Sequence, residues 1–137
     1  MAPADFNQQI IDEFRSNGGV VGGPFAGAPL LLLHTVGRKT GKERINPLAY
    51  QKVDAGWAIF ASFAGAPTNP AWYDNLMARA DATVEVGTDT LNVAVREATG
   101  DERDRIWARQ KEVMPGFAEY EEKAGGRIIP VVVLEPR

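Results

Sequence analysis

The chain has 137 residues, of which 45% are hydrophobic and 24% charged, and its formal net charge is -3. These values are ordinary for a soluble globular protein, and we expect residues 1–137 to form a single domain. Because cysteine is absent, disulfides and thiolate metal sites are excluded, and the lone His34 cannot build a histidine metal cluster. The sequence pI of about 5.2 argues against a nucleic-acid reader.

An amphipathic helix is predicted near the N-terminus, over Asp5–Arg15. Its apolar residues recur at helical spacing: Phe6, Ile10, Ile11 and Phe14. Most such stripes pack on their own domain and a minority lie on membranes or partner subunits, so a peripheral membrane contact stays open. The sequence shows no secretory signal and no membrane-spanning stretch, which predicts a cytoplasmic protein. The glycines at 18–19 and 22–23 are expected to end the helix and begin a flexible connector within 1–24.

Strand-like runs and hairpin turns dominate the rest of the chain. We expect strands over Leu30–Val36, Arg44–Val53, Trp57–Phe63, Thr83–Val86, Thr90–Glu97 and Ile128–Leu134. Further helices are expected over Ala71–Arg79, Asp101–Val113 and Phe117–Lys123. Hairpins with inserted helices indicate an α+β domain whose antiparallel sheet, of about six strands, closes or nearly closes a small barrel. A barrel of that size has no lumen for a ligand, so its site would lie where loops and inserted helices meet the wall.

The first two expected strands are joined by a basic turn with four cationic side chains: Arg38, Lys39, Lys42 and Arg44. Like charges held this close repel one another, so a polyanionic ligand is the simplest reason for an acidic protein to collect them. A solvated hairpin loop is the alternative, since such residues are common in turns. A P-loop is excluded because the spacing from Gly37 to Gly41 is one residue short and Glu43 replaces the required Ser or Thr. His34, in the apolar run before the turn, is expected to be a core or barrel-wall residue.

Two further blocks follow the basic turn. The first, at 61–67, carries small residues that permit a flat ring to approach the backbone closely. The second, at 69–76, offers the indole face of Trp72 for stacking and the amide of Asn75 for hydrogen bonds. Each residue has a structural alternative: Trp72 could be a core residue, Asn75 could satisfy local backbone, and Ser62 could bond a strand carbonyl.

Together, the blocks G-R-K-T-G-K-x-R-x-N-P-L and N-P-A-W-Y-x-N-L resemble the deazaflavin-dependent nitroreductase family of the split β-barrel flavin-binding superfamily. The resemblance covers residues 30–136. It implies a split β-barrel that binds coenzyme F420, an 8-hydroxy-5-deazaflavin with a phospholactyl-polyglutamate tail, and that reduces quinones, nitro compounds or activated enones and enoates. FMN is the less favoured cofactor, and a non-catalytic carrier of the deazaflavin is the alternative function. Flavin barrels of this type are often dimers, so a homodimer stays open.

The resemblance also implies roles for individual residues. The phosphate and tail would meet Arg38, Lys39, Thr40, Lys42, Arg44, Asn46 and Pro47. The ring would face Ala61, Ser62, Trp72 and Asn75. The candidate catalytic hydroxyls are Ser62 and Tyr120, and the electron acceptor would lie among Tyr50, Met114, Phe117 and Tyr120. Met114 and Phe117 stand where members that reduce bulky nitro compounds can carry tyrosine, which disfavours nitroimidazole substrates, and Phe63 replaces a lysine of some relatives.

Overall fold

The computed structural model describes all residues except 1–2, 21–28, 38, 55, 63–64 and 66–67. The strands are β1 (Leu30–Val36), β2 (Glu43–Val53), β3 (Gly56–Phe60), β4 (Asp81–Val86), β5 (Asp89–Glu97) and β6 (Val131–Pro136). The helices are α1 (Pro3–Ser16), α2 (Ala71–Arg79), α3 (Gly100–Val113) and α4 (Gly116–Lys123). The expected flexible connector falls mostly on 21–28 and therefore lies outside the described residues.

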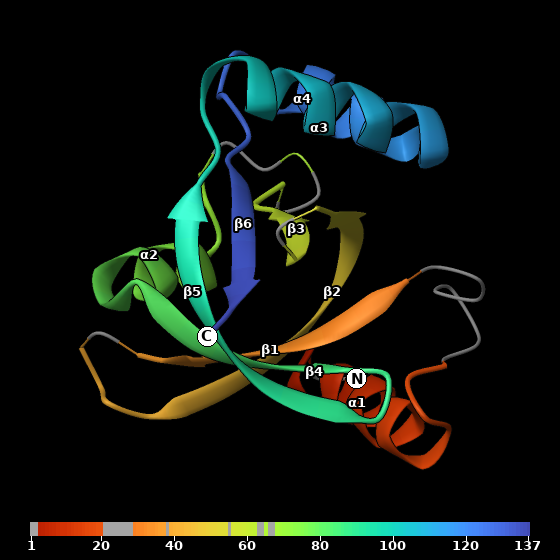
Figure 1. Cartoon of the computed structure of the whole chain (residues 1–137), viewed down its shortest axis with the longest axis vertical. Helices are drawn as coiled ribbons and strands as arrows, with labels where there is room; N and C mark the ends of the chain where they lie inside the picture. The colour runs from red at the N-terminus through yellow and green to blue at the C-terminus, as the bar shows by residue number, and fades with distance from the viewer. Residues whose placement is uncertain (1–2, 21–28, 38, 55, 63–64, 66–67) are drawn as a thin grey trace.

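The strands form a closed antiparallel barrel in the order β1-β2-β3-β6-β5-β4 (Figure 1). β1 closes the barrel because Leu33 is paired with Asn46 of β2 on one side and with Val84 of β4 on the other. Closure pairs each of these strands along both sides, which removes the exposed edges that promote aggregation. The predicted α+β class with an antiparallel split barrel is confirmed.

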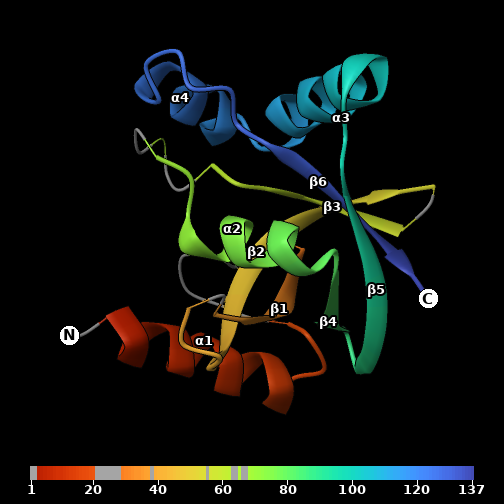
Figure 2. The same cartoon turned by 90° about the vertical axis from the view of Figure 1, so that its left-hand side faces the viewer.

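Alternate residues of the strands form one apolar cluster inside the barrel. Leu33, Val84 and Val93, from β1, β4 and β5, are fully buried in it. α2 packs over one side of the barrel, against the same three strands, and adds Trp72 and Leu76 to the cluster (Figure 2). Side chains therefore fill the interior, as expected for a barrel of this strand number.

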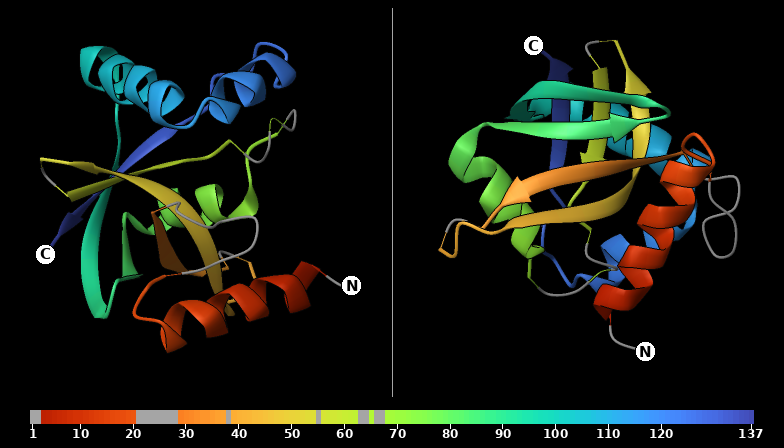
Figure 3. Two further views of the ribbon diagram at one scale, coloured as in Figure 1. Left: turned by 90° about the vertical axis from the view of Figure 1, so that its right-hand side faces the viewer. Right: turned by 90° about the horizontal axis from the view of Figure 1, so that it is seen from below.

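α1 covers the outer face of β1 and β2 (Figure 3). Its apolar residues Ile10, Ile11 and Phe14 are buried against Leu30 and Leu32. These three residues of the predicted stripe pack on the protein's own barrel, so they offer no apolar surface to a bilayer while α1 is docked. Among the described residues, no helix is long and apolar enough to cross a membrane.

α3 and α4 lie on the opposite side of the barrel from α1 (Figure 3). Phe117 of α4 packs against Phe60 of β3 and Trp107 of α3, with ring centroids 5.5 and 6.1 Å apart. A buried amide pair adds a polar tie, because Gln51 Nε2 of β2 donates to Gln110 Oε1 of α3 at 3.3 Å. These contacts fix α3 and α4 on the outer face of β2 and β3, and the same apolar cluster includes Val131 and Val133 of β6.

The predicted boundaries are off near Pro130. β3 ends at Phe60 rather than Phe63, and β6 begins at Val131 rather than Ile128. Ala61 N–H still donates to the carbonyl of Pro130 at 3.0 Å, but proline has no N–H to return a bond, so the ladder between the strands stops there. Every other predicted helix and strand agrees with the structure to within two residues at each end.

Candidate functional site

A cavity of about 460 Å³ opens where the basic turn between β1 and β2 meets the start of α2. Its lining consists of Gly37, Lys39, Thr40, Arg44, Asn46, Pro70, Ala71, Trp72, Asp74 and Asn75. The cavity therefore joins two blocks that are separate in the sequence, the basic turn and the segment 69–76. Its volume is within the range of small-molecule sites.

The basic turn is closed by its own backbone. Gly37 N–H donates to the carbonyl of Lys42 at 2.9 Å, and Gly41 N–H donates to the carbonyl of Gly37 at 2.8 Å. Gly41 has φ of 70°, a left-handed conformation that glycine adopts without the steric cost of a side chain. The turn thus presents Lys39 and Arg44 to the cavity from a defined backbone.

Three cations of the turn, Lys39, Lys42 and Arg44, are exposed and available to a ligand. Lys39, Lys42 and Arg44 form no ion pair with any residue that the structure describes. Lys42 and Pro47, which are neighbours of lining residues in the sequence, do not themselves line the cavity. Arg38, the remaining predicted cation, lies outside the described residues.

α2 presents its N-terminus to the same cavity. Pro70 is the N-cap residue and supplies no side-chain cap, and both Pro70 and Ala71 line the cavity. The first N–H groups of a helix have no partner within the helix and favour negative charge. Asp74, in the first turn of α2, adds one carboxylate to this otherwise cationic wall.

The orientation of α2 is fixed by Tyr73, a residue that the sequence-based prediction missed. Its hydroxyl donates to the carboxylate of Glu97 at the end of β5. Burial, together with this hydrogen bond, raises the pKa of Tyr73 to about 12. This hydrogen bond adds a polar tie between α2 and the barrel, beside the apolar packing of Trp72 and Leu76.

Trp72 and Asn75 are both buried, with 8% and 7% exposure, and both line the cavity. Trp72 also belongs to the apolar cluster inside the barrel. The two alternatives considered for Trp72, a core residue or a ligand contact, are therefore not exclusive, since one indole can pack in the core and border the cavity.

The predicted ring-facing residues Ala61 and Ser62 follow β3 and are buried, but they do not line the cavity. Arg127, after α4, contacts both of them. Its Nη1 donates to the carbonyl of Ala61 at 3.1 Å and its Nη2 to the carbonyl of Ser62 at 2.7 Å. A third bond joins Arg127 to the side-chain oxygen of Asn69. The sequence gives no local signal for this role, because the partners lie 58–66 residues away.

The structure brings together three of the four predicted acceptor residues. The rings of Phe117 and Tyr120 pack edge to face, with centroids 5.3 Å apart. Met114 packs against the same apolar cluster, which lies between the barrel wall and helices α3 and α4. Tyr50 does not join them, because it packs against the cluster inside the barrel. Gly65 lies close to this region, since a Cβ at this position would lie 2.8 Å from the carbonyl oxygen of Tyr120.

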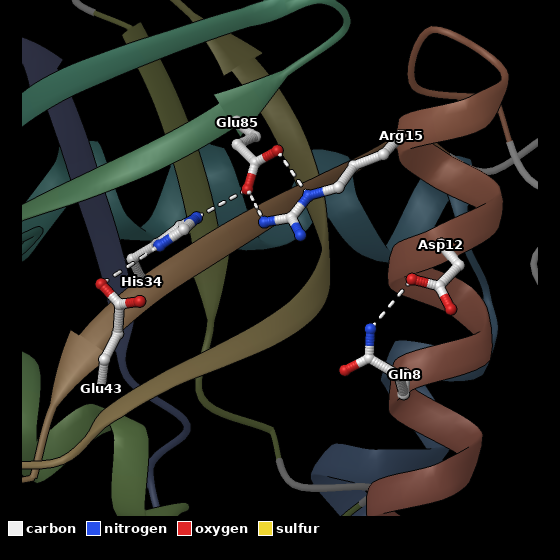
Figure 4. Close-up of polar contacts among 6 residues, drawn as sticks. All are labelled: Gln8, Asp12, Arg15, His34, Glu43 and Glu85. Carbon is white, nitrogen blue, oxygen red and sulfur yellow. Dashed lines mark hydrogen bonds and ion pairs between the residues drawn. The ribbon is translucent and has the colours of Figure 1, made fainter.

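His34 lies on the barrel wall, apart from the residues that line the cavity. It is part of a charged chain that ties α1 to the barrel (Figure 4). Arg15 of α1 donates to both carboxylate oxygens of Glu85 on β4, at 3.0 and 2.6 Å, and His34 Nε2 lies 2.7 Å from the same carboxylate. The hydrogen bond from Arg15 is the main reason that the pKa of Glu85 is lowered, because it stabilises the charged form.

The cavity has the chemistry of a site for an anion attached to a flat ring. Two cations, a hydroxyl and a helix N-terminus can each donate to phosphate or carboxylate oxygens, and charge-assisted hydrogen bonds contribute roughly 1.5–3 kcal/mol each. The part of the Trp72 indole that lines the cavity supplies an apolar, planar surface beside them. The residues present therefore fit a cofactor that combines a polyanionic tail with an aromatic ring system.

Comparison with known proteins supports the same conclusion. The family model for F420H(2)-dependent quinone reductase matches residues 7–136. A Mycobacterium tuberculosis (strain H37Rv) protein named F420H(2)-dependent quinone reductase is 35% identical over 128 residues, which cover 90% of this chain and 85% of the relative. A solved structure described as an F420-H2 dependent reductase (FDR-A) is 37% identical, with a TM-score of 0.70 over 78% of this chain and 94% of the other. Another, described as a domain-swapped dimer, is 33% identical, with a TM-score of 0.72 over 98% of this chain and all of the other.

Proposed function

The chain belongs to the F420H(2)-dependent quinone reductase family, and we propose that it is an oxidoreductase that uses coenzyme F420 to reduce quinones. The observation that carries the proposal is the cavity that joins Lys39, Arg44 and the N-terminus of α2 to Trp72 and Asn75. Nitro compounds and activated enones are further acceptors to test. Residues 1–137 act as one cofactor-binding domain in this proposal.

The residues around the cavity bind and orient the cofactor. Arg44 can hold a phosphate through two parallel hydrogen bonds, whereas Lys39 acts as a point charge toward the tail carboxylates. Thr40 and Asn46 add neutral donors on the same wall, and Lys42, Pro47 and Arg38 complete the proposed tail site. The ring system is held by four residues: the indole of Trp72, the amide of Asn75, and the small residues Ala61 and Ser62.

The reduced deazaflavin supplies the hydride when it is bound, so the protein need supply little covalent chemistry. Its work is to hold the two reactants in contact and to exclude water. The hydroxyls of Ser62 and Tyr120 donate hydrogen bonds to the acceptor oxygen that gains charge during reduction. Met114 and Phe117 flank Tyr120 with apolar surface, which suits a flat quinone. Tyr50 is partly buried against the interior cluster, apart from Met114, Phe117 and Tyr120, so the acceptor site proposed here rests on those three residues and Ser62.

FMN is the rival cofactor, since its single phosphate would also suit a basic turn. Several cations spread over one turn suit a polyanionic tail better than one phosphate. The test is to titrate the purified protein with oxidised F420 and with FMN in parallel, following fluorescence. We expect tighter binding of F420, and tighter binding of FMN would overturn the proposed cofactor. Tight binding of F420 without turnover of any acceptor would favour the carrier function.

A homodimer is also proposed. It is supported by the domain-swapped dimer that matches nearly the whole chain. Sedimentation velocity with and without F420 tests the proposal, and a monomer under both conditions would contradict it.

We also propose a cytoplasmic location. A polyanionic cofactor does not enter a bilayer interior unaided, so the enzyme must share a compartment with the supply of its cofactor.

A further inference from the structure

We propose that Arg127 is a positioning residue that sets the floor of the ring site, acting through the backbone of Ala61 and Ser62 and through Asn69. The half-buried guanidinium donates to the two backbone carbonyls at 3.1 and 2.7 Å and to the side-chain oxygen of Asn69. This inference rests on the proposed function, because the ring site is defined by the cofactor.

Arg127 holds two points of the segment that connects β3 to α2. Ala61 and Ser62 leave the barrel at the end of β3, and Asn69 directly precedes Pro70, the N-cap of α2 that lines the cavity. The side chain therefore fixes the ring-facing backbone at one end of the segment and the entry to the anion-binding helix at the other.

The same residue also connects this segment to the acceptor side. Arg127 follows α4 closely, and its own N–H donates to the carbonyl of Ala124 at the end of that helix, at 3.3 Å. Gly65 of the connecting segment lies against Tyr120 of α4. Arg127 thus joins the proposed ring floor to the helix that carries the proposed acceptor residues.

Arginine is suited to this task because of its geometry. A guanidinium presents five N–H donors in a rigid plane, whereas a lysine ammonium is a compact point charge on a flexible stem. The three named acceptors are neutral oxygens from different parts of the chain. Lysine at this position would keep the positive charge but lose the planar fork that spans them.

The test compares two ligands and two arginines. The ligands are F420 and the deazaflavin ring with its ribityl chain but without phosphate or tail. The variants are Arg127→Lys and a matched control, Arg109→Lys, at an exposed arginine of α3. We expect Arg127→Lys to weaken binding of both ligands by the same factor, about fivefold or more, because one or two of the hydrogen bonds that the guanidinium donates are lost. The control should leave both affinities unchanged.

A general loss of structure would also weaken both ligands by the same factor, so each titration is paired with a thermal melt, and only a variant with a wild-type Tm counts as a test. If Arg127→Lys fails to fold, Asn69→Ala serves instead, because it removes one hydrogen-bond acceptor and leaves Arg127 in place. We expect it to weaken the binding of both ligands by the same factor, one smaller than that expected for Arg127→Lys. Unchanged affinities in a folded Arg127→Lys protein, or a loss confined to the tail-bearing cofactor, would overturn the inference. A wild-type protein that binds neither ligand would instead overturn the proposed function.

Discussion

Lys39 and Arg44 are the residues on which cofactor affinity should depend most. Both line the cavity, and neither forms an ion pair with a described residue. Replacing both by alanine should weaken F420 binding by about tenfold or more, because charge-assisted hydrogen bonds are lost. Wild-type binding should also weaken with rising salt and with a shorter polyglutamate tail, since exposed charges are screened over about 8 Å at 0.15 M salt.

Fluorescence titration of wild type and double variant measures the effect of the substitutions. Repeating the wild-type titration at two salt concentrations, and with F420 of two tail lengths, measures the effects of salt and tail. A double variant with the same change of charge, Arg79→Ala with Arg109→Ala, is the control because both arginines are exposed and neither lines the cavity. An affinity that changes with neither tail length nor ionic strength would contradict the proposed polyanion site.

Tyr120 and Ser62 should affect the chemical step more than cofactor binding. Tyr120→Phe removes a hydroxyl while keeping the ring that packs on Phe117. We expect slower hydride transfer, by at most about 10²–10³-fold and by less if two donors share the task, with F420 affinity nearly unchanged. Ser62→Ala should act in the same direction. Stopped-flow mixing of the loaded, reduced enzyme with a quinone measures the step, and wild-type rates in both variants would place the acceptor elsewhere.

Trp72 joins stability to binding at a single side chain. Because it packs in the barrel cluster and lines the cavity, Trp72→Ala should lower the free energy of unfolding by about 3–5 kcal/mol and also weaken F420 binding. Chemical denaturation and titration measure the two effects separately. Normal stability with normal affinity would show that the indole serves neither purpose.

At the scale of elements, α1 is tied to the barrel by charge as well as by apolar packing. Arg15 lowers the pKa of Glu85 below its ordinary value of 4.5 in the folded protein. A depressed carboxyl pKa stabilises the fold above the unfolded-state pKa, and this stabilisation is lost as the pH falls through the folded-state pKa. Glu85→Gln should therefore lower the Tm at pH 7, and the difference from wild type should disappear in acid.

Thermal melts across this pH range test the tie. Glu112→Gln, at an exposed carboxylate of α3, is the control for a general loss of charge. A Tm difference between Glu85→Gln and wild type that stays constant from pH 7 into acid would show that the carboxylate charge is not the cause.

The helices and strands were largely predictable because their signals are local. Hairpin turns such as Asp54–Gly56 and proline before Ala71 mark boundaries within a few residues of sequence. Pro130 was also visible, but its effect on the ends of β3 and β6 depends on which strands pair, which the sequence does not state.

The candidate site was likewise predictable only in part. The basic turn and Trp72 were predictable because cationic clustering and motif spacing are properties of neighbouring residues. Arg127 and Tyr73 were not, since their roles depend on partners brought close only by the barrel. The position of Tyr50 could not be predicted for a related reason: its side of the strand is set by register, which places it against the interior cluster that also contains Trp72.

For the whole molecule, the charge distribution is the feature that fits the proposed function. The chain is acidic overall, yet four of its 15 lysines and arginines lie within one turn, and this turn meets a helix N-terminus and an indole at the cavity. The proposed acceptor residues lie on α4 and just before it, and Gly65, between β3 and α2, lies against Tyr120 of α4.

The most direct test of this account is the anaerobic oxidation of reduced F420 by a naphthoquinone, with and without the purified protein. Recovery of the absorbance of the oxidised cofactor reports the reaction. We expect a rate that rises in proportion to enzyme concentration and falls sharply in the Lys39→Ala, Arg44→Ala double variant at limiting cofactor. A rate no faster with protein than without it, under conditions where F420 is shown to bind, would contradict the account.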